Sequence, residues 1–208
     1  MTAAAQTGRH AGVVRRPRDV ALAAGGAVAL VLASLPVQQH SVSGAETAVF
    51  RALNSVTVLP FVVVWPVMQL GNVLAVPSAA VVAAGFRRWR LAAGLLLAGA
   101  GVYLLAKQVK GVVVRGRPDG LLSDVVVRGA PALGRGYVSG HAAVVTSLLV
   151  VAWPWLSRPA RIVCSVLAAA VCLARVYVGA HLPLDVLGGA ALGLAVAGAV
   201  RLVTGHPR

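Results

Sequence analysis

The feature that most constrains this chain is its series of long apolar runs. A run of about 20 predominantly apolar residues with few or no charges is typical of a transmembrane helix. A transmembrane β-barrel would show short segments of alternating hydrophobicity instead, and none occur. The sequence therefore predicts an all-α fold, a polytopic membrane helical bundle with six transmembrane helices. The expected spans are approximately Val20–Val37, Val73–Phe86, Leu91–Ala106, Ala142–Leu156, Ile162–Val178 and Val186–Val203.

Composition supports this class. Of the 208 residues, 59% are hydrophobic and 12% are charged, whereas a soluble domain carries about 25% charged residues. The start of the second span stays open because Pro60 and Pro66 interrupt the apolar residues before it. The first run follows a basic tail, as a signal peptide would, but its length favours a retained helix. We expect a basic cytoplasmic tail at residues 1–18 and a single transmembrane domain at residues 19–208.

The distribution of arginine predicts the orientation. The N-terminal tail, Arg87–Arg90, Ser157–Arg161 and Arg201–Arg208 fall on one face of a six-span bundle. By the positive-inside rule this face, with both termini, is cytoplasmic. The opposite face should be poor in cations, yet Lys107–Arg135 is strongly basic. A loop that departs from the rule in this way is expected to bind an anion.

The net charge of +14 would otherwise suggest a nucleic-acid partner. Several arginines lie at the ends of apolar runs, where they contact anionic lipid headgroups. The sequence has no aromatic-rich basic stripe of the kind that binds single strands. Membrane lipids, and not nucleic acid, are therefore the expected partners.

A short helix is predicted between the first two spans. Ser43-Gly44-Ala45-Glu46 fits a capping box at a helix start, and an apolar face follows. The segment Ser43–Val56 is expected to lie on the outer membrane surface. A lid over a site is one interpretation of this helix, and a packing strut is the favoured one.

Three short polar motifs follow one another near the outer boundary of the predicted membrane. Charged residues are costly near lipid, so such a concentration predicts a functional site. Arginine supplies forked donors to phosphate and lysine a point charge. Ser139 and Gly140 directly precede an apolar helix, whose N-terminus would present free N–H groups to an anion. The motifs are Lys110-x6-Arg117-Pro118, Ser139-Gly140-His141 and Arg175-x5-His181-x3-Asp185.

In order, internal spacing and placement, these motifs resemble the signature of the type 2 phosphatidic acid phosphatase (PAP2) superfamily, over roughly residues 40–205. The resemblance implies that His181 is the nucleophile that forms a phosphohistidine. Asp185, one helical turn away, would fix the tautomer of His181. His141 would be the general acid, and Lys110, Arg117, Ser139, Gly140 and Arg175 would bind the phosphate.

The chain departs from the usual family pattern at two positions. Val138 stands where proline is common, and Ala174 stands where serine is common. We expect changes in rate or substrate preference more than a change in chemistry. Outside the motifs, we interpret two arginines as solvated loop charges and three histidines as solvated side chains. These are Arg115 and Arg128, and His10, His40 and His206.

The sequence predicts no metal or other cofactor. Asp119, Asp124 and Asp185 do not form the paired clusters that hold Mg²⁺, and the cations supply the positive charge that a metal would bring. A serine hydrolase is excluded because the chain has no G-x-S-x-G elbow.

The expected function is hydrolysis of a lipid phosphate or diphosphate at the extracytoplasmic leaflet. A polyprenyl diphosphate or a related polyprenyl-phosphate lipid is the favoured substrate, because recycling of envelope carriers needs phosphatases on this leaflet. Phosphatidylglycerophosphate and phosphatidic acid are the alternatives. A vanadium-dependent haloperoxidase would share the motifs, but those enzymes are soluble. From a different class, a catalytically silent lipid-phosphate binder or transporter stays open, although such a protein would need only the cations. The sequence does not indicate the oligomeric state.

Overall fold

The computed structural model describes residues 15–37, 40–129 and 133–206. Within these ranges the chain is helical and contains no strand, which confirms the all-α prediction. The elements are α1 (Pro17–Ser34), α2 (Gly44–Asn54), α3 (Phe61–Gln69), α4 (Ala75–Gly85), α5 (Trp89–Val112), α6 (Pro118–Leu121), α7 (Gly140–Ala152), the 3₁₀ turn η1 (Trp153–Trp155), α8 (Arg158–Tyr177) and α9 (Pro183–Thr204).

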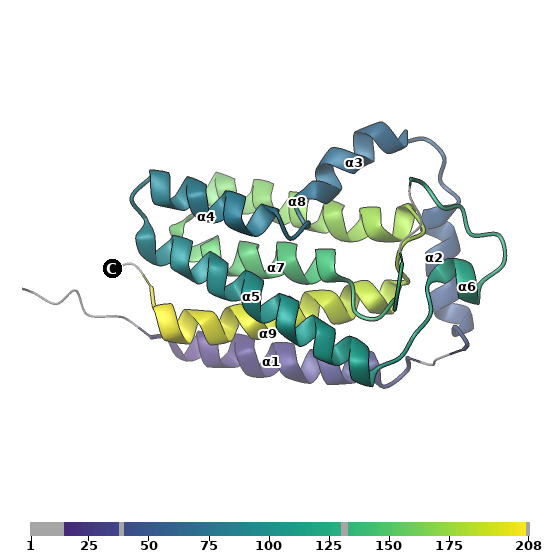
Figure 1. Ribbon diagram of the computed structural model, residues 1–208, viewed down its shortest axis with the longest axis horizontal. Coiled ribbons are helices and arrows are strands. Elements are labelled where there is room, and N and C mark those ends of the chain that lie inside the picture. The colour runs from purple at the N-terminus through teal and green to yellow at the C-terminus, as the bar shows by residue number, and fades with distance from the viewer. Residues whose placement is uncertain (1–14, 38–39, 130–132, 207–208) are drawn as a thin grey trace, which may run out of the picture.

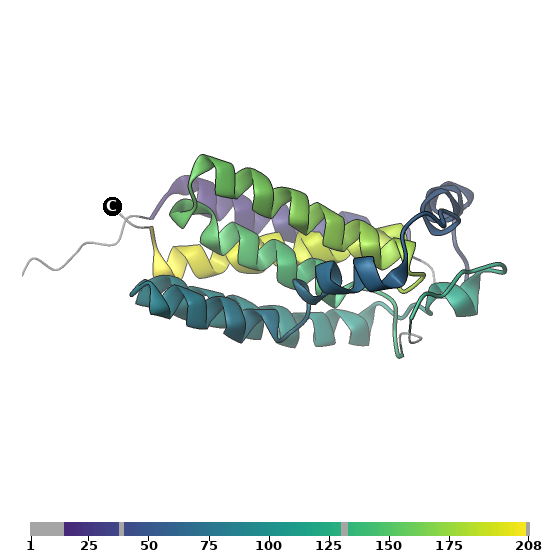
Figure 2. The same ribbon diagram turned by 90° about the horizontal axis from the view of Figure 1, so that it is seen from above.

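Helices α1, α4, α5, α7, α8 and α9 form an elongated bundle, and α2 and α6 lie beyond one end of it (Figures 1 and 2). The short helix α3 packs against α8. Helix α9 packs against α1, α5 and α7. Glycines on α9 permit this close packing: a Cβ atom at Gly193 would lie 2.5 Å from the Ala143 carbonyl oxygen, and one at Gly198 would lie 2.4 Å from the Ala23 nitrogen. Small residues are common where membrane helices approach closely.

The predicted spans coincide with α1, α4, α5, α7 with η1, α8 and α9. Four helices in the described ranges, α1, α5, α8 and α9, are long and apolar enough to cross a membrane. Helices α4 and α7 are apolar but shorter, so the count of six spans stays a prediction. The first apolar run forms α1, and a Cβ atom at Gly26 would lie 2.4 Å from the Ala195 nitrogen of α9. This contact supports a retained helix.

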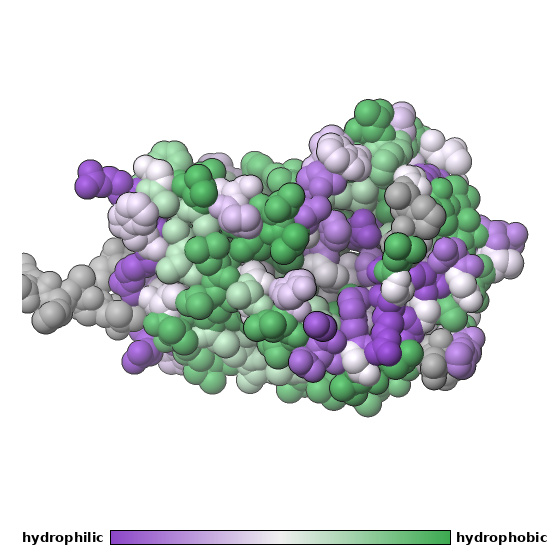
Figure 3. Space-filling view, in the orientation of Figure 1, coloured by the Kyte–Doolittle hydropathy of each residue, from purple (hydrophilic) through white to green (hydrophobic). Residues whose placement is uncertain are grey.

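The surface has the character of a membrane protein. Large hydrophobic side chains are exposed along α1, α4, α5 and α8, including Leu32, Val81, Leu104 and Val166. On the face in Figure 3, hydrophobic residues dominate the middle and hydrophilic residues gather at the left end and in the right-hand part. A band of this kind suits the hydrocarbon region of a bilayer.

Helix α2 confirms the helix predicted after Ser43. The Glu46 backbone N–H donates to the Ser43 hydroxyl at 3.2 Å. At the other end of α2, the Asn54 amide donates to the carbonyl oxygens of Val126 at 2.9 Å and Tyr177 at 3.0 Å. These hydrogen bonds hold the C-terminal end of α2 against the loop at Val126 and the end of α8. They favour the interpretation of α2 as a packing strut over its interpretation as a lid.

The end of the bundle that lies away from α2 contains a buried charge cluster that was not predicted. His206 is 1% exposed, and its Nε2 lies 2.5 Å from Asp19 Oδ2. Arg201 Nη2 lies 2.9 Å from Asp19 Oδ1. The prediction that His206 is solvated was wrong because the residues after α9 turn back onto the first turn of α1. His40 is exposed as expected, and His10 lies outside the described residues.

Candidate active site

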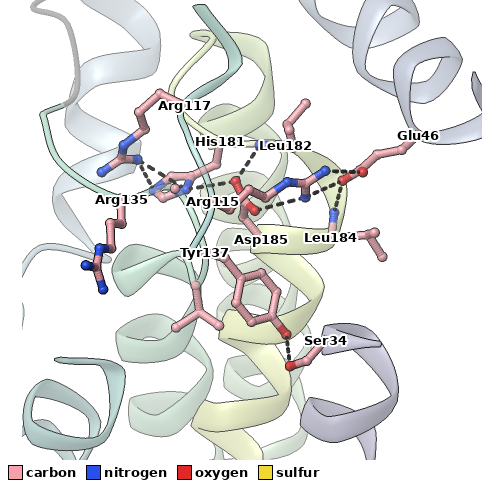
Figure 4. Close-up of polar contacts among 12 residues, drawn as sticks. Ser34, Glu46, Arg115, Arg117, Arg135, Tyr137, His181, Leu182, Leu184 and Asp185 are labelled. Carbon is pink, nitrogen blue, oxygen red and sulfur yellow. Dashed lines mark hydrogen bonds and ion pairs between the residues drawn. The ribbon is translucent and has the colours of Figure 1, made fainter. Parts of the chain in front are cut away.

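The three motifs meet at one end of the bundle. Lys110 lies in the last turn of α5, and Arg117 directly precedes α6. Gly140 and His141 open α7, and Arg175 lies in the last turn of α8. The third motif continues through the turn into α9. Figure 4 shows Arg117 of the first motif beside His181 and Asp185 of the third motif.

His181 lies at the centre of this site and is 3% exposed. Its Nδ1 is 3.5 Å from Asp185 Oδ2, and Arg117 Nη1 is 2.9 Å from its Nε2 and 3.2 Å from its Nδ1. An ionised carboxylate only accepts hydrogen bonds, so in a neutral imidazole the nitrogen that faces Asp185 carries the proton. We therefore assign the proton to Nδ1, which faces the carboxylate, and the lone pair to Nε2.

The surroundings of His181 keep its ring neutral. Burial lowers the pKa of His181 from 6.5 to about 3, because the imidazolium form is poorly solvated there. The hydrogen bond with Asp185 opposes this shift, and the positive charge of Arg117 adds to it. A neutral imidazole with a free Nε2 lone pair can act as a nucleophile at ordinary pH.

Asp185 is fully buried in the first turn of α9. Its Oδ2 accepts a hydrogen bond from the Leu182 backbone N–H at 2.9 Å and also faces His181. Its Oδ1 accepts from Arg115 Nη1 at 3.2 Å. Both carboxylate oxygens are thus held, and the side chain has a single orientation toward the imidazole.

The prediction that Arg115 is a solvated loop charge was wrong. Arg115 is 1% exposed, and its Nη1 and Nη2 lie 3.0 Å and 2.6 Å from the two carboxylate oxygens of Glu46. Glu46 Oε1 also accepts from the Leu184 backbone N–H at 2.9 Å. One signal was available, because Glu46 is the only glutamate in the chain, but the capping-box pattern already accounted for it.

Backbone contacts fix the two cations of the first motif. Arg117 donates to the carbonyl oxygens of Ala180 at 2.8 Å and Leu133 at 3.0 Å, which holds its guanidinium against His181. Lys110 Nζ donates to the carbonyl oxygens of Arg135 at 2.9 Å and Val138 at 2.7 Å. Lys110 therefore supports the loop before α7 in this structure.

The second motif has the expected position at the start of α7. Ser139 is buried and is the N-cap residue, but its side chain makes no capping hydrogen bond. The Ser139 backbone N–H donates to the Asp185 carbonyl oxygen at 2.8 Å, which joins this loop to the third motif. The Ser139 hydroxyl is buried without a hydrogen-bond partner among the described residues.

His141 lines two separate cavities. One, of about 330 Å³, is lined by His141 and Arg175 and is covered by Phe61 and Trp65 of α3. The other, of about 380 Å³, is lined by α5, by the start of α7 and by residues 71–73, and its polar lining includes Lys107, Lys110 and His141. The remainder of the second cavity is mostly apolar. A phosphate beside His141 could therefore carry a hydrocarbon chain that extends along the bundle.

Arg128, also predicted to be a solvated charge, lines the first cavity. Its guanidinium lies over the Tyr177 ring, 4.2 Å from the ring centre. Its Nη2 donates to the carbonyl oxygens of Asn54 at 2.9 Å and Val56 at 2.7 Å. That prediction was wrong because the carbonyl groups at the end of α2 and the Tyr177 ring provide a binding place for this side chain.

The donor set at the site is cationic. In residues 15–37, 40–129 and 133–206, no three His, Cys, Asp or Glu side chains lie together as metal ligands would. Arg117, Arg175 and Lys110 provide the positive charge near His181 and His141. Such a set suits an anion with several oxygens.

Comparison with known proteins agrees with the resemblance of the three motifs to the PAP2 superfamily. The sequence profile of the PAP2 superfamily matches residues 87–206, which include all three motifs. The structure of Aquifex aeolicus LpxE is similar in fold, with 24% identity, a TM-score of 0.72, and coverage of 80% of this chain and 99% of that chain.

A second similar structure is the first transmembrane PAP2 type phosphatidylglycerolphosphate phosphatase from Bacillus subtilis. It has 27% identity and a TM-score of 0.65, and the match covers 88% of this chain and 94% of that chain. No curated protein sequence matches significantly. The profile match, over more than half of the chain, and the cationic histidine site lead to one conclusion: this chain belongs to the PAP2 superfamily and is a membrane phosphatase of that family.

Proposed function

We propose that the protein removes phosphate from a phosphorylated or diphosphorylated membrane lipid through a phosphohistidine at His181. The observation that carries this proposal is the buried His181–Asp185 pair, with Nδ1 facing the carboxylate at 3.5 Å and Arg117 Nη1 2.9 Å from Nε2. A phosphate at this position would be bound by the Arg117 guanidinium, close to the Nε2 lone pair that attacks phosphorus.

The reaction has two displacements at phosphorus. In the first, Nε2 of His181 attacks, the P–N bond forms, the bond from phosphorus to the lipid oxygen breaks, and His141 gives that oxygen a proton. In the second, His141 takes a proton from a water molecule, the water attacks phosphorus, and the P–N bond breaks. Asp185 stabilises the positive charge that develops on the imidazole ring.

The phosphate-binding groups surround the position of attack. Arg117 and Arg175 supply guanidinium donors, Lys110 supplies a point charge, and Ser139 and Gly140 place the N-terminus of α7 beside the anion. Phosphoryl transfer depends mainly on positioning and on charge stabilisation at the equatorial oxygens. No metal ion is needed for this arrangement.

A lipid substrate is supported by the mostly apolar cavity that leads from His141 between α5 and α7. We favour a polyprenyl diphosphate or a related polyprenyl-phosphate lipid. Phosphatidylglycerophosphate is the second candidate, favoured by the name of the similar Bacillus subtilis enzyme. The start of α1, the start of α5 and the end of α9 lie at the end of the bundle opposite the site (Figure 1). These helix ends carry Arg18, Arg88 and Arg201, which supports an extracytoplasmic active site and cytoplasmic termini.

Phosphate release by the purified protein in detergent with EDTA tests this proposal. Polyprenyl diphosphate, phosphatidylglycerophosphate and phosphatidic acid are assayed side by side. Release from at least one of them is expected, and the fastest substrate ranks the three lipid classes. Binding of these lipids without release from any of them would favour the silent binder.

The pH dependence of kcat/KM is a further expected result. Because burial lowers the pKa of His181 from 6.5 to about 3, His181 in the free enzyme stays neutral over the usual assay range. Its acid limb should therefore lie well below pH 6.5. Burial, together with the positive charges of Arg175 and Arg117, lowers the pKa of His141 from 6.5 to about 4, so the alkaline limb of the free enzyme should also lie below pH 6.5.

Measurement of kcat/KM from about pH 4 to about pH 9 checks this expectation. The phosphate of the substrate ionises near a pKa of about 6, so its titration is measured separately and removed from the profile. An acid limb of the enzyme at the ordinary histidine pKa would contradict the neutral, desolvated state of His181.

A further inference from the structure

A buried chain of charges links α2 to the site. Glu46 on α2 binds Arg115 through both carboxylate oxygens at 3.0 Å and 2.6 Å, and Arg115 binds Asp185 Oδ1 at 3.2 Å (Figure 4). Glu46 is 6% exposed, Arg115 1% and Asp185 0%. Water screens such groups weakly, so each charge is felt strongly by its neighbours.

The geometry divides the contacts of Asp185 between its two oxygens. Arg115 holds Oδ1, whereas Oδ2 accepts from Leu182 N–H at 2.9 Å and faces His181 Nδ1 at 3.5 Å. Glu46 also accepts from the backbone N–H of Leu184 at 2.9 Å, which fixes the first turn of α9 where Asp185 lies. The position of the carboxylate therefore depends on α2.

The charge balance gives Glu46 a second effect. Within the chain Glu46–Arg115–Asp185, two carboxylates and one guanidinium leave a net charge of −1. Arg117 is a separate cation beside the imidazole. Arg115 makes two contacts with Glu46 and one with Asp185. Without Glu46, Arg115 would neutralise Asp185 alone, and the imidazole would face a pair with no net charge.

We propose that Glu46 and Arg115 are positioning residues that orient Asp185 and preserve its negative charge for the imidazolium that develops on His181. This inference rests on the proposed function of His181. It also assigns α2 a purpose beyond packing, since α2 carries the carboxylate that balances Arg115.

The test is a set of charge variants assayed for phosphate release over a range of lipid phosphate concentrations, which gives kcat and KM separately. Glu46→Gln should lower kcat by about 10- to 100-fold, the range found when a residue that orients a metal ligand is replaced, because Glu46 orients Asp185 in a similar way. KM should change little, because Glu46 contacts neither Arg117 nor Arg175 in the described structure. The double variant Glu46→Gln with Arg115→Gln restores the net charge of −1, so its kcat should exceed that of Glu46→Gln.

A purely structural role predicts the opposite order. If Glu46 and Arg115 only hold α2 in place, the double variant should be no faster than Glu46→Gln, and this result would overturn the inference. Asn54→Ala is the matched control, because it removes the hydrogen bonds at the other end of α2 without changing the charge. It should lower the Tm and leave kcat near the wild-type value.

Two further measurements keep the test decisive. If Glu46→Gln does not fold, Glu46→Asp, which keeps the charge, is compared with Glu46→Ala. The kcat of Glu46→Asp is expected to be much closer to the wild-type value. Equal losses of kcat in the two variants would contradict the charge argument. His181→Ala in the same assay separates the two proposals. Activity that survives His181→Ala rejects the proposed function, whereas wild-type kcat in Glu46→Gln, with His181→Ala inactive, rejects only the positioning role.

Discussion

His181→Ala is expected to abolish phosphate release and to leave binding of the lipid phosphate nearly intact. The variant loses the Nε2 lone pair that attacks phosphorus, whereas the cations Arg117, Arg175 and Lys110 remain. Loss of a catalytic nucleophile costs a factor of about 10⁴ to 10⁶ in kcat. Initial rates of phosphate release and direct binding of the lipid in detergent measure the two effects separately.

His40→Ala is the control for this variant, because His40 is an exposed histidine outside the three motifs. Its kcat should equal that of the wild-type protein. Appreciable turnover by His181→Ala, above the trace that a contaminating phosphatase would give, would show that His181 is not the nucleophile.

Asp185→Asn is expected to have the second largest effect, with a decrease in kcat of about 10⁴-fold, the size seen when the aspartate of a Ser-His-Asp triad becomes asparagine. Asp185 Oδ2 faces Nδ1 of His181 at 3.5 Å. An asparagine can turn its NH₂ group toward Nδ1, which moves the ring proton to Nε2 and removes the lone pair.

Asp124→Asn provides the comparison, since Asp124 is exposed and has a positive φ of 63°, a conformation that asparagine tolerates. This variant should keep wild-type kcat and Tm. The two asparagine variants are assayed together for kcat and for thermal unfolding. An Asp185→Asn protein that is folded and retains near-wild-type kcat would show that the carboxylate does not control the tautomer of His181.

The motif residues could be predicted because their spacing is local. His181 and Asp185 are one helical turn apart, and Ser139, Gly140 and His141 open a helix that the next apolar run makes visible. A short segment fixes each group, and membrane helices bring the segments to a common end. The profile match over residues 87–206 confirms the family that this pattern indicates.

The partners of these residues could not be predicted, because they lie far away in the sequence. Glu46 and Arg115 are 69 positions apart and Asp19 and His206 are 187 apart. Three of these side chains had a sufficient local explanation: Glu46 as part of a cap, Arg115 as a loop charge and His206 as a solvated side chain. Only the packing of α2 and α1 against α9 shows that they are buried and must be paired.

Helix boundaries were predictable where composition changes sharply and less so where proline intervenes. The run Leu91–Ala106 lies within α5, which extends from Trp89 to Val112. Around Pro60 and Pro66 the chain forms the separate helix α3, with Pro66 inside it. No periodicity in the sequence indicates that α3 covers the cavity beside His141 and Arg175.

The most direct test of a histidine phosphatase is to trap the phosphoryl group on the protein. An aryl phosphate with an acidic phenol needs no proton on its leaving group, so His141→Ala should still form the phosphoenzyme but should hydrolyse it slowly. After a rapid alkaline quench, which preserves phosphohistidine, peptide mass spectrometry locates the group. We predict one phosphoryl group on His181, absent from His181→Ala with His141→Ala; no phosphorylated peptide, or a phosphoryl group on another residue, would contradict the account.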